Sequence, residues 1–230
     1  MREIVLDTET TGLDPFLGHR IVEIGCIELV NCIPSNATFH VYLNPERDMP
    51  PEAEAIHGLS SAFLADKPKF ADIAESFIEF LGDAKLVIHN AGFDLTFLNA
   101  ELDRLKHPPI GRDRTVDTLA LARRRHPGAP NRLDDLCARY GIDNSRRTKH
   151  GALLDAELLA EVYAELVGGR QARLSLDQER AAVRAVAVTA AKTRPAPLSP
   201  RLTADEEGAH QALLTTLGAE AVWRDYIAEK

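Results

Sequence analysis

Residues 4–12 read Ile4-Val5-Leu6-Asp7-Thr8-Glu9-Thr10-Thr11-Gly12, and this stretch decides the fold. Three aliphatic residues run directly into two carboxylates one position apart, and a glycine ends the run. The aliphatic content predicts a short buried strand. Side chains alternate between the two faces of a strand, so Asp7 and Glu9 project to the same side, roughly 7 Å apart.

Two like charges at the end of a buried strand repel each other and lose hydration. Clustered carboxylate oxygens are the ligands that Mg²⁺ and Mn²⁺ prefer, so Asp7 and Glu9 indicate a site for a hard divalent cation. On this interpretation, removing a repelling carboxylate, as in Asp7→Ala or Asp155→Ala, raises stability in metal-free buffer. The alternative for an isolated D-x-E is a strand that simply runs out into solvent, where both groups are already hydrated.

Size and composition fit one domain of about 150 to 200 residues with an appendage. Apolar residues make up 45% of the 230 residues, which is enough for an ordinary core. We expect neither a membrane span nor a signal peptide. Three scattered cysteines without CxxC spacing, Cys26, Cys32 and Cys137, fit reduced thiols in a cytoplasm. The net charge of −8 means that contact with a polyanion must be local, metal-assisted or helped by partner subunits.

The hydrophobic pattern predicts a mixed sheet covered by helices, which is an α/β fold. Predicted strands cover residues 4–9, 21–29, 39–43, 86–88 and 115–116, with a polar turn at 31–36 that makes the first three an antiparallel meander. Predicted helices cover residues 52–57, 70–81, 93–105, 117–125, 131–140 and 152–167, with Asp117 and Asn131 as candidate caps.

Composition changes after Gly169. Residues 170–201 are rich in Ala and Arg and then in Pro, which is typical of an extended linker. From Thr203 the chain regains a helical pattern, but the segment 203–230 is too short to bury its apolar residues alone. The sequence therefore predicts a domain at 1–169, a linker at 170–202 and a helical tail at 203–230.

Two further clusters contain candidate site residues. His89-Asn90-Ala91-Gly92-Phe93-Asp94 lies where a buried strand turns into a helix, although Asp94 alone could merely cap that helix. In His150-Gly151-Ala152-Leu153-Leu154-Asp155, residues 150 and 155 would point about 140° apart on one helix. Placing His150 in the preceding loop, with Gly151 as the joint, lets both side chains reach one site.

Taken together, these carboxylates and the histidine suit two-metal phosphoryl transfer. Two cations about 4 Å apart can activate water and stabilise the leaving oxygen. A histidine, whose pKa is near neutral, can take the proton from that water.

The three motifs resemble those of the DEDD-type 3′–5′ exonucleases in their histidine-bearing branch: Asp7-x-Glu9-Thr-Thr-Gly12, His89-Asn-Ala-x-Phe93-Asp94 and His150-x4-Asp155. Within that branch the chain resembles the epsilon-type proofreading subunits of bacterial DNA polymerase III, as Phe39-His-Val-Tyr-Leu43 and Leu136-Cys-Ala-Arg-Tyr140 support. The resemblance covers about residues 1 to 170 and implies a ribonuclease H-like fold, a five-stranded mixed sheet with its first three strands antiparallel.

The resemblance also implies roles for individual residues. Asp7, Glu9 and Asp155 would bind one Mg²⁺ or Mn²⁺ ion, Asp7 and Asp94 a second, and His150 would be the general base. The 3′-terminal nucleotide would lie against a larger set, which comprises Asp7, Glu9, Thr10, Thr11, Gly12, Leu13, Glu52, His57, Asn90, Phe93 and Asp155. His89, Asp117 and Asn131 would support these residues or be structural.

The implied reaction is hydrolysis of the terminal phosphodiester at a single-stranded or frayed DNA 3′ end, releasing a nucleoside 5′-monophosphate. Residues 171–176 (Gln-Ala-Arg-Leu-Ser-Leu) resemble a peptide that docks on the sliding clamp (beta), and the tail 203–230 resembles the segment that binds the polymerase III alpha subunit. Whether a small theta-like subunit binds stays open. The implied location is the bacterial cytoplasm, at the nucleoid-associated replisome. Arg146, Arg147 and Lys149 adjoin His150 and are candidates for phosphate contact.

Two alternatives remain. A related exoribonuclease that trims RNA 3′ ends would share the metal site but would not need the linker and tail. A catalytically inactive scaffold between clamp and polymerase would have no use for the unneutralised carboxylates.

Overall fold

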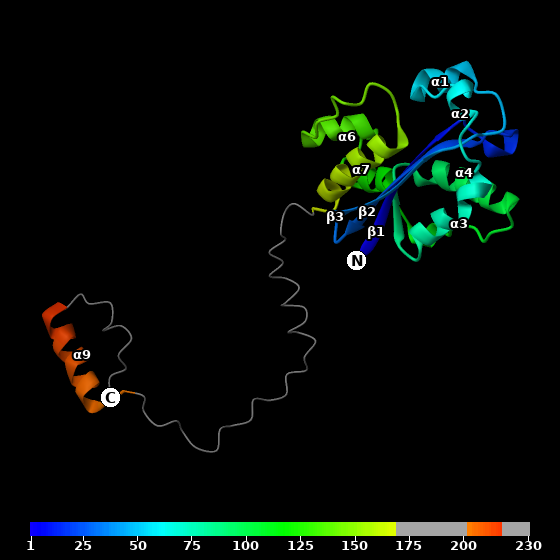
Figure 1. Ribbon diagram of the computed structural model, residues 1–230. Coiled ribbons are helices and arrows are strands. Elements are labelled where there is room, and N and C mark those ends of the chain that lie inside the picture. The colour runs from blue at the N-terminus through cyan, green and yellow to red at the C-terminus, as the bar shows by residue number, and fades with distance from the viewer. Residues whose placement is uncertain (169–201, 218–230) are drawn as a thin grey trace. The chain divides into compact units, whose positions relative to one another are not determined.

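The computed structural model describes residues 1–168 and 202–217 (Figure 1). Contacts divide the chain into two units, residues 1–174 and 175–230. Three predictions lie outside the described residues. They are the domain boundary at residue 169, the linker over residues 170–201 with its segment 171–176, and the part of the tail at residues 218–230.

One mixed sheet of five strands forms the centre of the first unit, in the order β3-β2-β1-β4-β5. The strands are β1 (Arg2–Thr10), β2 (Ile21–Val30), β3 (Ile33–Tyr42), β4 (Lys85–Ile88) and β5 (Thr115–Asp117). The pairs β1–β2 and β2–β3 are antiparallel, whereas β1–β4 and β4–β5 are parallel. The predicted fold class, with its first three strands antiparallel, is confirmed.

Helices cover both faces of this sheet (Figure 1). They are α1 (Pro51–His57), α2 (Ser61–Leu64), α3 (Phe70–Leu81), α4 (Ala91–Arg104), α5 (Thr118–Arg125), α6 (Leu133–Tyr140) and α7 (Ala152–Leu166), with 3-10 turns η1 (Pro15–Leu17) and η2 (Arg112–Arg114). The described part of the second unit holds α9 (Ala204–Leu217). The periodicity of residues 70–81 predicted α3 with its observed bounds.

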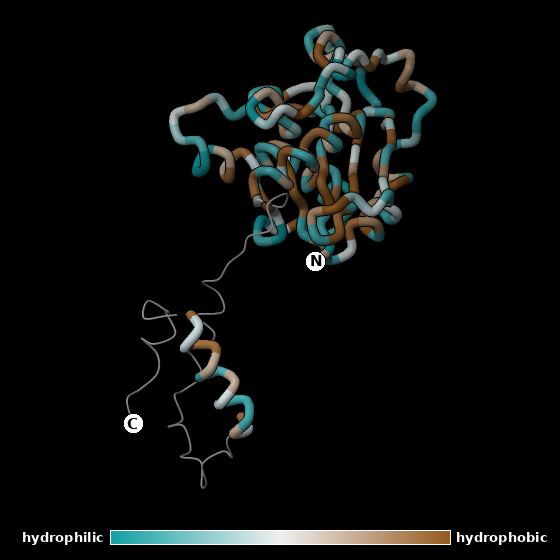
Figure 2. The backbone as a smooth tube through the Cα atoms, turned by 90° about the vertical axis from the view of Figure 1, so that its left-hand side faces the viewer, coloured by the Kyte–Doolittle hydropathy of each residue, from teal (hydrophilic) through white to brown (hydrophobic). Residues whose placement is uncertain are grey.

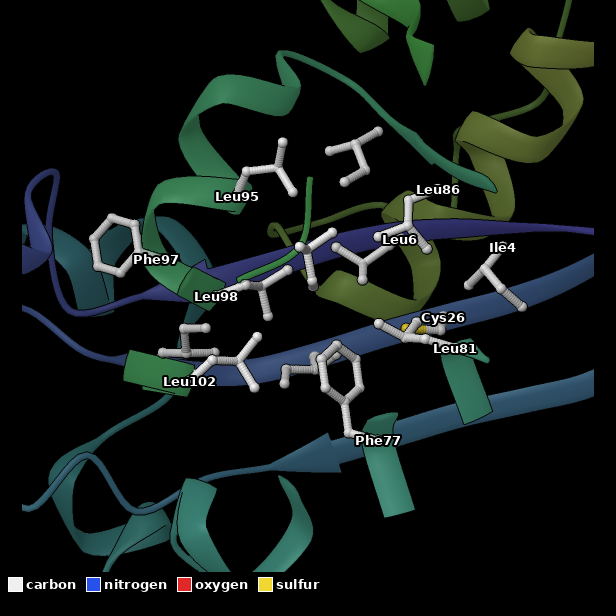
Figure 3. Close-up of a cluster of buried hydrophobic side chains, with 14 of the residues drawn as sticks. Ile4, Leu6, Cys26, Phe77, Leu81, Leu86, Leu95, Phe97, Leu98 and Leu102 are labelled. Carbon is white, nitrogen blue, oxygen red and sulfur yellow. The ribbon is translucent and has the colours of Figure 1, made fainter. Parts of the chain in front are cut away.

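The alternation of side chains along β1 assigns each face of the sheet to a different group of helices. Ile4 and Leu6 are fully buried against α3 and α4, in the cluster drawn in Figure 3. Val5 points to the other face and packs against Ala156 and Leu159 of α7. Figure 2 shows hydrophobic stretches gathered inside this unit and hydrophilic stretches in its outer loops. β1 is therefore buried on both faces.

Two local predictions were wrong. The predicted polar turn at 31–36 shrinks to Asn31 and Cys32, which have positive φ of 54° and 63°, and β3 already begins at Ile33. Most side chains of residues 33–38 are exposed at the sheet edge, so this part of β3 lacks an alternating hydrophobic pattern. The helix predicted at 131–140 begins at Leu133.

Asn131 is therefore not the cap of α6. Its Nδ2 donates to the backbone carbonyls of His126 and Ala129 at 3.3 and 2.8 Å, which closes the preceding loop. Asp135 instead accepts a hydrogen bond of 2.9 Å from the Arg132 backbone N–H at the start of the helix. Within the described residues no helix is both long and apolar enough to cross a bilayer.

Candidate active site

The end of β1, the start of α4 and the loop before α7 meet at one cavity of about 1060 Å³. The site residues predicted on these three elements all line it: Asp7, Glu9, Asn90, Phe93, Asp94, His150 and Asp155. They come from positions up to 148 residues apart, from Asp7 to Asp155. The fold thus brings the three sequence motifs to one place.

Gly25 on β2 lets α7 come close enough for this. It pairs with Asp7 across the β1–β2 ladder, and a Cβ at this position would lie 2.3 Å from backbone atoms of Ala152 and Leu153. Sequence reasoning missed Gly25. The available signal was a glycine inside an otherwise aliphatic strand, which marks close approach of another backbone.

Among the described residues, the three carboxyl groups of β1 and α4 lack a cationic partner strong enough to keep them ionised at their usual pKa. Burial, then repulsion from Asp94 and Glu9, raises the pKa of Asp7 well above its usual range. Burial and the charge of Asp155 raise the pKa of Glu9 to about 8. Burial raises the pKa of Asp94 to about 7, against the opposing effect of a hydrogen bond from Thr8. Each of these groups therefore lacks a sufficient cationic partner in the described part of the chain.

Asp155 differs from the other three because it has a cationic partner. Burial alone would raise its pKa, but hydrogen bonds from His150 and Arg147 outweigh burial and lower it. The Arg147 guanidinium lies 2.5 Å from Oδ1 and 2.7 Å from Oδ2. The expectation that removing Asp155 raises stability is therefore corrected, since its removal would take the bidentate partner from a buried arginine.

His150 lies in the loop before α7, as predicted, and Gly151 at the start of the helix has an extended backbone with φ of −160°. The His150 Nδ1 is 3.2 Å from Asp155 Oδ2 and 2.7 Å from Arg147 Nη2. The His150 backbone N–H also donates to the Ile56 carbonyl at 3.3 Å, which holds this loop against α1. About half of the His150 side chain is exposed, so water can reach it.

The donor set fits a divalent cation. One potential ligand atom from each of Glu9, His150 and Asp155 lies within 4.8 Å of the other two. Asp7 and Asp94 line the same cavity, and their raised pKa values show that positive charge would stabilise their ionised forms. Clustered carboxylate oxygens suit a hard divalent cation.

A second cavity of about 580 Å³ adjoins the first and shares Thr8, Glu9 and Phe93 with it. The remaining predicted substrate-binding residues line this second cavity: Thr10, Thr11, Gly12, Leu13, Glu52 and His57. Its other walls include the apolar side chains of Leu17, Ala53 and Ile56. An apolar hollow beside a carboxylate cluster suits a nucleoside whose phosphate reaches the carboxylates.

Several polar groups of the second cavity already have partners inside the protein. The Thr10 hydroxyl donates to the Gly12 carbonyl at 2.7 Å, and the Thr11 hydroxyl accepts from the Arg20 backbone N–H at 3.0 Å. His57 Nδ1 accepts from the Leu59 backbone N–H at 3.0 Å. Its buried Nε2 has no hydrogen-bond partner of normal geometry within residues 1–168 and 202–217, and burial lowers the pKa of His57. Thr10 and Thr11 therefore shape this cavity, and His57 has a ring nitrogen left for a ligand.

The supporting residues behave in different ways. Asp117 caps α5 by accepting from the Leu119 and Ala120 backbone N–H groups at 2.9 and 3.2 Å, as predicted. His89 Nδ1 lies 2.9 Å from the Thr118 hydroxyl, and burial lowers the pKa of His89. The first contact caps α5 at the end of β5, and the second joins the residue after β4 to the first residue of α5.

Basic side chains line one wall of the first cavity. Arg123, Arg132 and Arg147 face it, whereas Arg125 donates to the Leu166 carbonyl at 2.7 Å and Arg146 is largely exposed. Of the candidates in the 146–149 segment, Arg147 lines the cavity, and the carboxylate of Asp155 already holds it.

The exonuclease family (RNase_T) matches residues 4–163. The DNA polymerase III subunit epsilon of Rickettsia conorii is 50% identical over 222 residues, which cover 94% of this chain and 96% of that protein. The subunit of the same name from Escherichia coli K12 is 43% identical over 242 residues, which cover 97% of each chain.

Solved structures agree on the architecture. Exonuclease X in complex with 5′ overhanging duplex DNA aligns with a TM-score of 0.58 at 27% identity, over 72% of this chain and 91% of that one. The nuclease domain of 3′hExo, a DEDDh family member bound to rAMP, aligns with a TM-score of 0.63 at 17% identity, over 73% of this chain and 92% of that one. The second likeness bears on the fold alone.

Proposed function

This chain belongs to the exonuclease family and, within it, to the DNA polymerase III epsilon subunits, and we propose that it proofreads DNA synthesis by removing nucleotides from the 3′ end. The observation that carries the proposal is the convergence of Asp7, Glu9, Asp94, Asp155 and His150 on one cavity next to an apolar one. The reaction is hydrolysis of the terminal phosphodiester, which releases a nucleoside 5′-monophosphate.

Asp7, Glu9 and Asp155 would hold one divalent cation, and Asp7 with Asp94 a second. When bound, such cations activate water and stabilise the charge that develops on the leaving 3′ oxygen. Their identity as Mg²⁺ or Mn²⁺, and their number of two, are part of this proposal.

His150 would act as the general base. Its Nδ1 lies 2.7 Å from Arg147 Nη2 and 3.2 Å from Asp155 Oδ2, whereas Nε2 is 3.5 Å from Arg147 Nη2, so we assign to Nε2 the proton taken from water. The partial exposure of the ring lets it pass that proton on to solvent. A general base of this kind is worth about 10² to 10⁴ in rate.

The second cavity would hold the terminal nucleoside. Leu13, Ile56 and Phe93 offer apolar and aromatic surface to the base and sugar, and His57 Nε2 offers a polar group. Bases of every kind stack on such surfaces, so the pocket need not read sequence. A mispaired end frays more easily than a paired one, which would favour removal of errors without base-specific contacts.

The tail would bind the polymerase alpha subunit. Leu213 and Leu217 on α9 are four residues apart, share one face of the helix and are more than half exposed. The segment 171–176 lies outside the described residues, so sliding-clamp docking is proposed from sequence resemblance alone, and binding of a theta-like subunit stays open. Tethering raises the local concentration of the exonuclease at the primer end, which suits an acidic chain.

A metal-dependent cleavage assay on 3′-mispaired and matched DNA, with RNA of the same sequence alongside, tests the activity. We expect faster cleavage of the mispaired DNA, which stops when the metal is chelated. A strong preference for RNA would favour the exoribonuclease alternative. If no substrate were cleaved in the presence of metal, the alternative of a catalytically inactive scaffold would be supported instead.

A further inference from the structure

Arg147 is a buried cation inside the carboxylate cluster. Its side chain is only 8% exposed, whereas that of the neighbouring Arg146 is 73% exposed and reaches Glu157 at 3.4 Å. Nε and Nη2 of Arg147 donate hydrogen bonds to the two oxygens of Asp155, which makes a bidentate ion pair. This loop residue is thus built into the site and is not part of a solvated basic face.

The position of Arg147 conflicts with a metal ion at the same carboxylate. Asp155, with Glu9 and His150, forms the group whose ligand atoms lie within 4.8 Å of one another. Arg147 occupies both Asp155 oxygens and also lies 2.7 Å from His150 Nδ1. A divalent cation drawn to this group would meet a guanidinium already in contact with two of its three members, and the two cations repel.

Asp134 offers Arg147 a second place to bind. This α6 side chain is more than half exposed, lines the first cavity and accepts a hydrogen bond of 2.7 Å from Arg147 Nη1. Asn144 in turn donates to Asp134 at 3.1 Å. Asp134 can therefore retain Arg147 at the cavity wall when Asp155 is taken, with Nε and Nη2 freed toward the cavity. A phosphodiester oxygen is the acceptor that suits such a fork.

We propose that Arg147 is an exchangeable counter-ion: it neutralises Asp155 in the metal-free protein, yields Asp155 to a divalent cation, and then binds the phosphate of the terminal nucleotide. The metal site and the phosphate site are thereby coupled, and each ligand raises affinity for the other. The proposal rests on the exonuclease function above for the nature of the phosphate ligand. The predicted competition between Arg147 and the metal for Asp155 can be measured whether or not the protein cleaves DNA.

Titration of Mn²⁺ into the full chain, followed by calorimetry, measures this competition directly. We expect Arg147→Ala to bind Mn²⁺ about 5-fold or more tightly than wild type in the absence of nucleotide, because the internal competitor is gone. Arg146→Ala is the matched control and should stay within about twofold of wild type. Arg147→Lys keeps the charge without the fork, and its Mn²⁺ affinity should fall between those of wild type and Arg147→Ala.

A second titration adds thymidine 5′-monophosphate at saturation. Wild type should gain more Mn²⁺ affinity from the nucleotide than Arg147→Ala does, by about 5-fold. Mn²⁺ affinity that is unchanged or weaker in both Arg147 variants, or equal in the Arg146 and Arg147 variants, would overturn the proposal. Wild-type cleavage of mispaired DNA, measured in parallel, shows whether the exonuclease function holds when this proposal fails.

Discussion

The hydroxyl of Thr8 on β1 donates a hydrogen bond of 2.7 Å to the carboxylate of Asp94 on α4, and both residues are buried. Thr8 lies between Asp7 and Glu9, and it follows Ile4 and Leu6 on the strand face that packs against α3 and α4. Asp7 and Glu9 follow Val5, which faces α7 and hence Asp155. Alternate residues of one strand thus face the two helices that carry Asp94 and Asp155, and Thr8 binds the first of these carboxylates directly.

Thr8→Val should weaken both folding and activity. The valine keeps the shape but leaves Asp94 without its hydroxyl donor, which costs about 1 to 3 kcal/mol when the acceptor stays buried. Urea unfolding measures the loss of stability, and steady-state cleavage measures the loss of kcat. Thr96→Val, which removes a hydroxyl from the exposed side of the same helix, is the control. Equal unfolding midpoints for the two variants would contradict the structural role of Thr8.

Asp7→Asn and Asp155→Asn should change the metal-free stability in opposite directions. Asp7→Asn removes a carboxylate that is buried and repelled by Asp94 and Glu9, so unfolding in a chelator should become harder. Asp155→Asn removes the bidentate partner of buried Arg147 and leaves it only the more exposed Asp134, so it should destabilise the protein by up to roughly 3 kcal/mol. Both variants should lose cleavage. Denaturant unfolding with a chelator checks the signs, and stabilisation of both variants would refute the pairing of Asp155 with Arg147.

His150→Ala should lower kcat by about 10² to 10⁴. The ring lines the first cavity and is about half exposed, so its removal leaves no buried void. Single-turnover cleavage of mispaired DNA measures the chemical step. His107→Ala removes a histidine that pairs with Glu75 on the surface and should keep the wild-type rate. A His150→Ala rate equal to that control would exclude the general-base role.

The pH dependence of stability should be smaller in His57→Gln than in wild type. Burial lowers the pKa of folded His57, so as the pH falls below about 6.5 the unfolded chain takes up the proton first. The resulting stability is present above the unfolded pKa and is lost as the pH falls toward the folded one. Urea unfolding at pH 7.5 and about pH 5.5 should therefore show a smaller loss in the variant.

Deletion of residues 203–230 should leave cleavage intact and remove binding to the polymerase alpha subunit. The family match and both cavities lie within residues 4–163, so the chemistry does not depend on the tail. Pull-down with the alpha subunit, alongside cleavage of mispaired DNA, separates the two properties. A truncated chain that still binds the alpha subunit would refute the tether.

The sequence by itself determined the sheet, most of the helices and the identity of the carboxylates. The continuous aliphatic run of residues 4–6 reflects burial on both faces of a strand, and the period-3.6 pattern of residues 70–81 reflects burial on one helix face; both are local properties. The edge strand from Ile33 and the short helix α2 left no such pattern, because few of their side chains are buried.

Only the tertiary structure decided how charge is distributed among the four carboxylates. Burial raises the pKa values of Asp7, Glu9 and Asp94. Asp155 instead binds Arg147, which lies in a loop eight residues earlier in the chain. Electrostatic energy depends on separations in space and on burial, and a one-dimensional spacing fixes neither. The role of Gly25 could not be predicted from spacing either. A Cβ at this position would lie 2.3 Å from backbone atoms of a helix that begins more than 120 residues further along the chain.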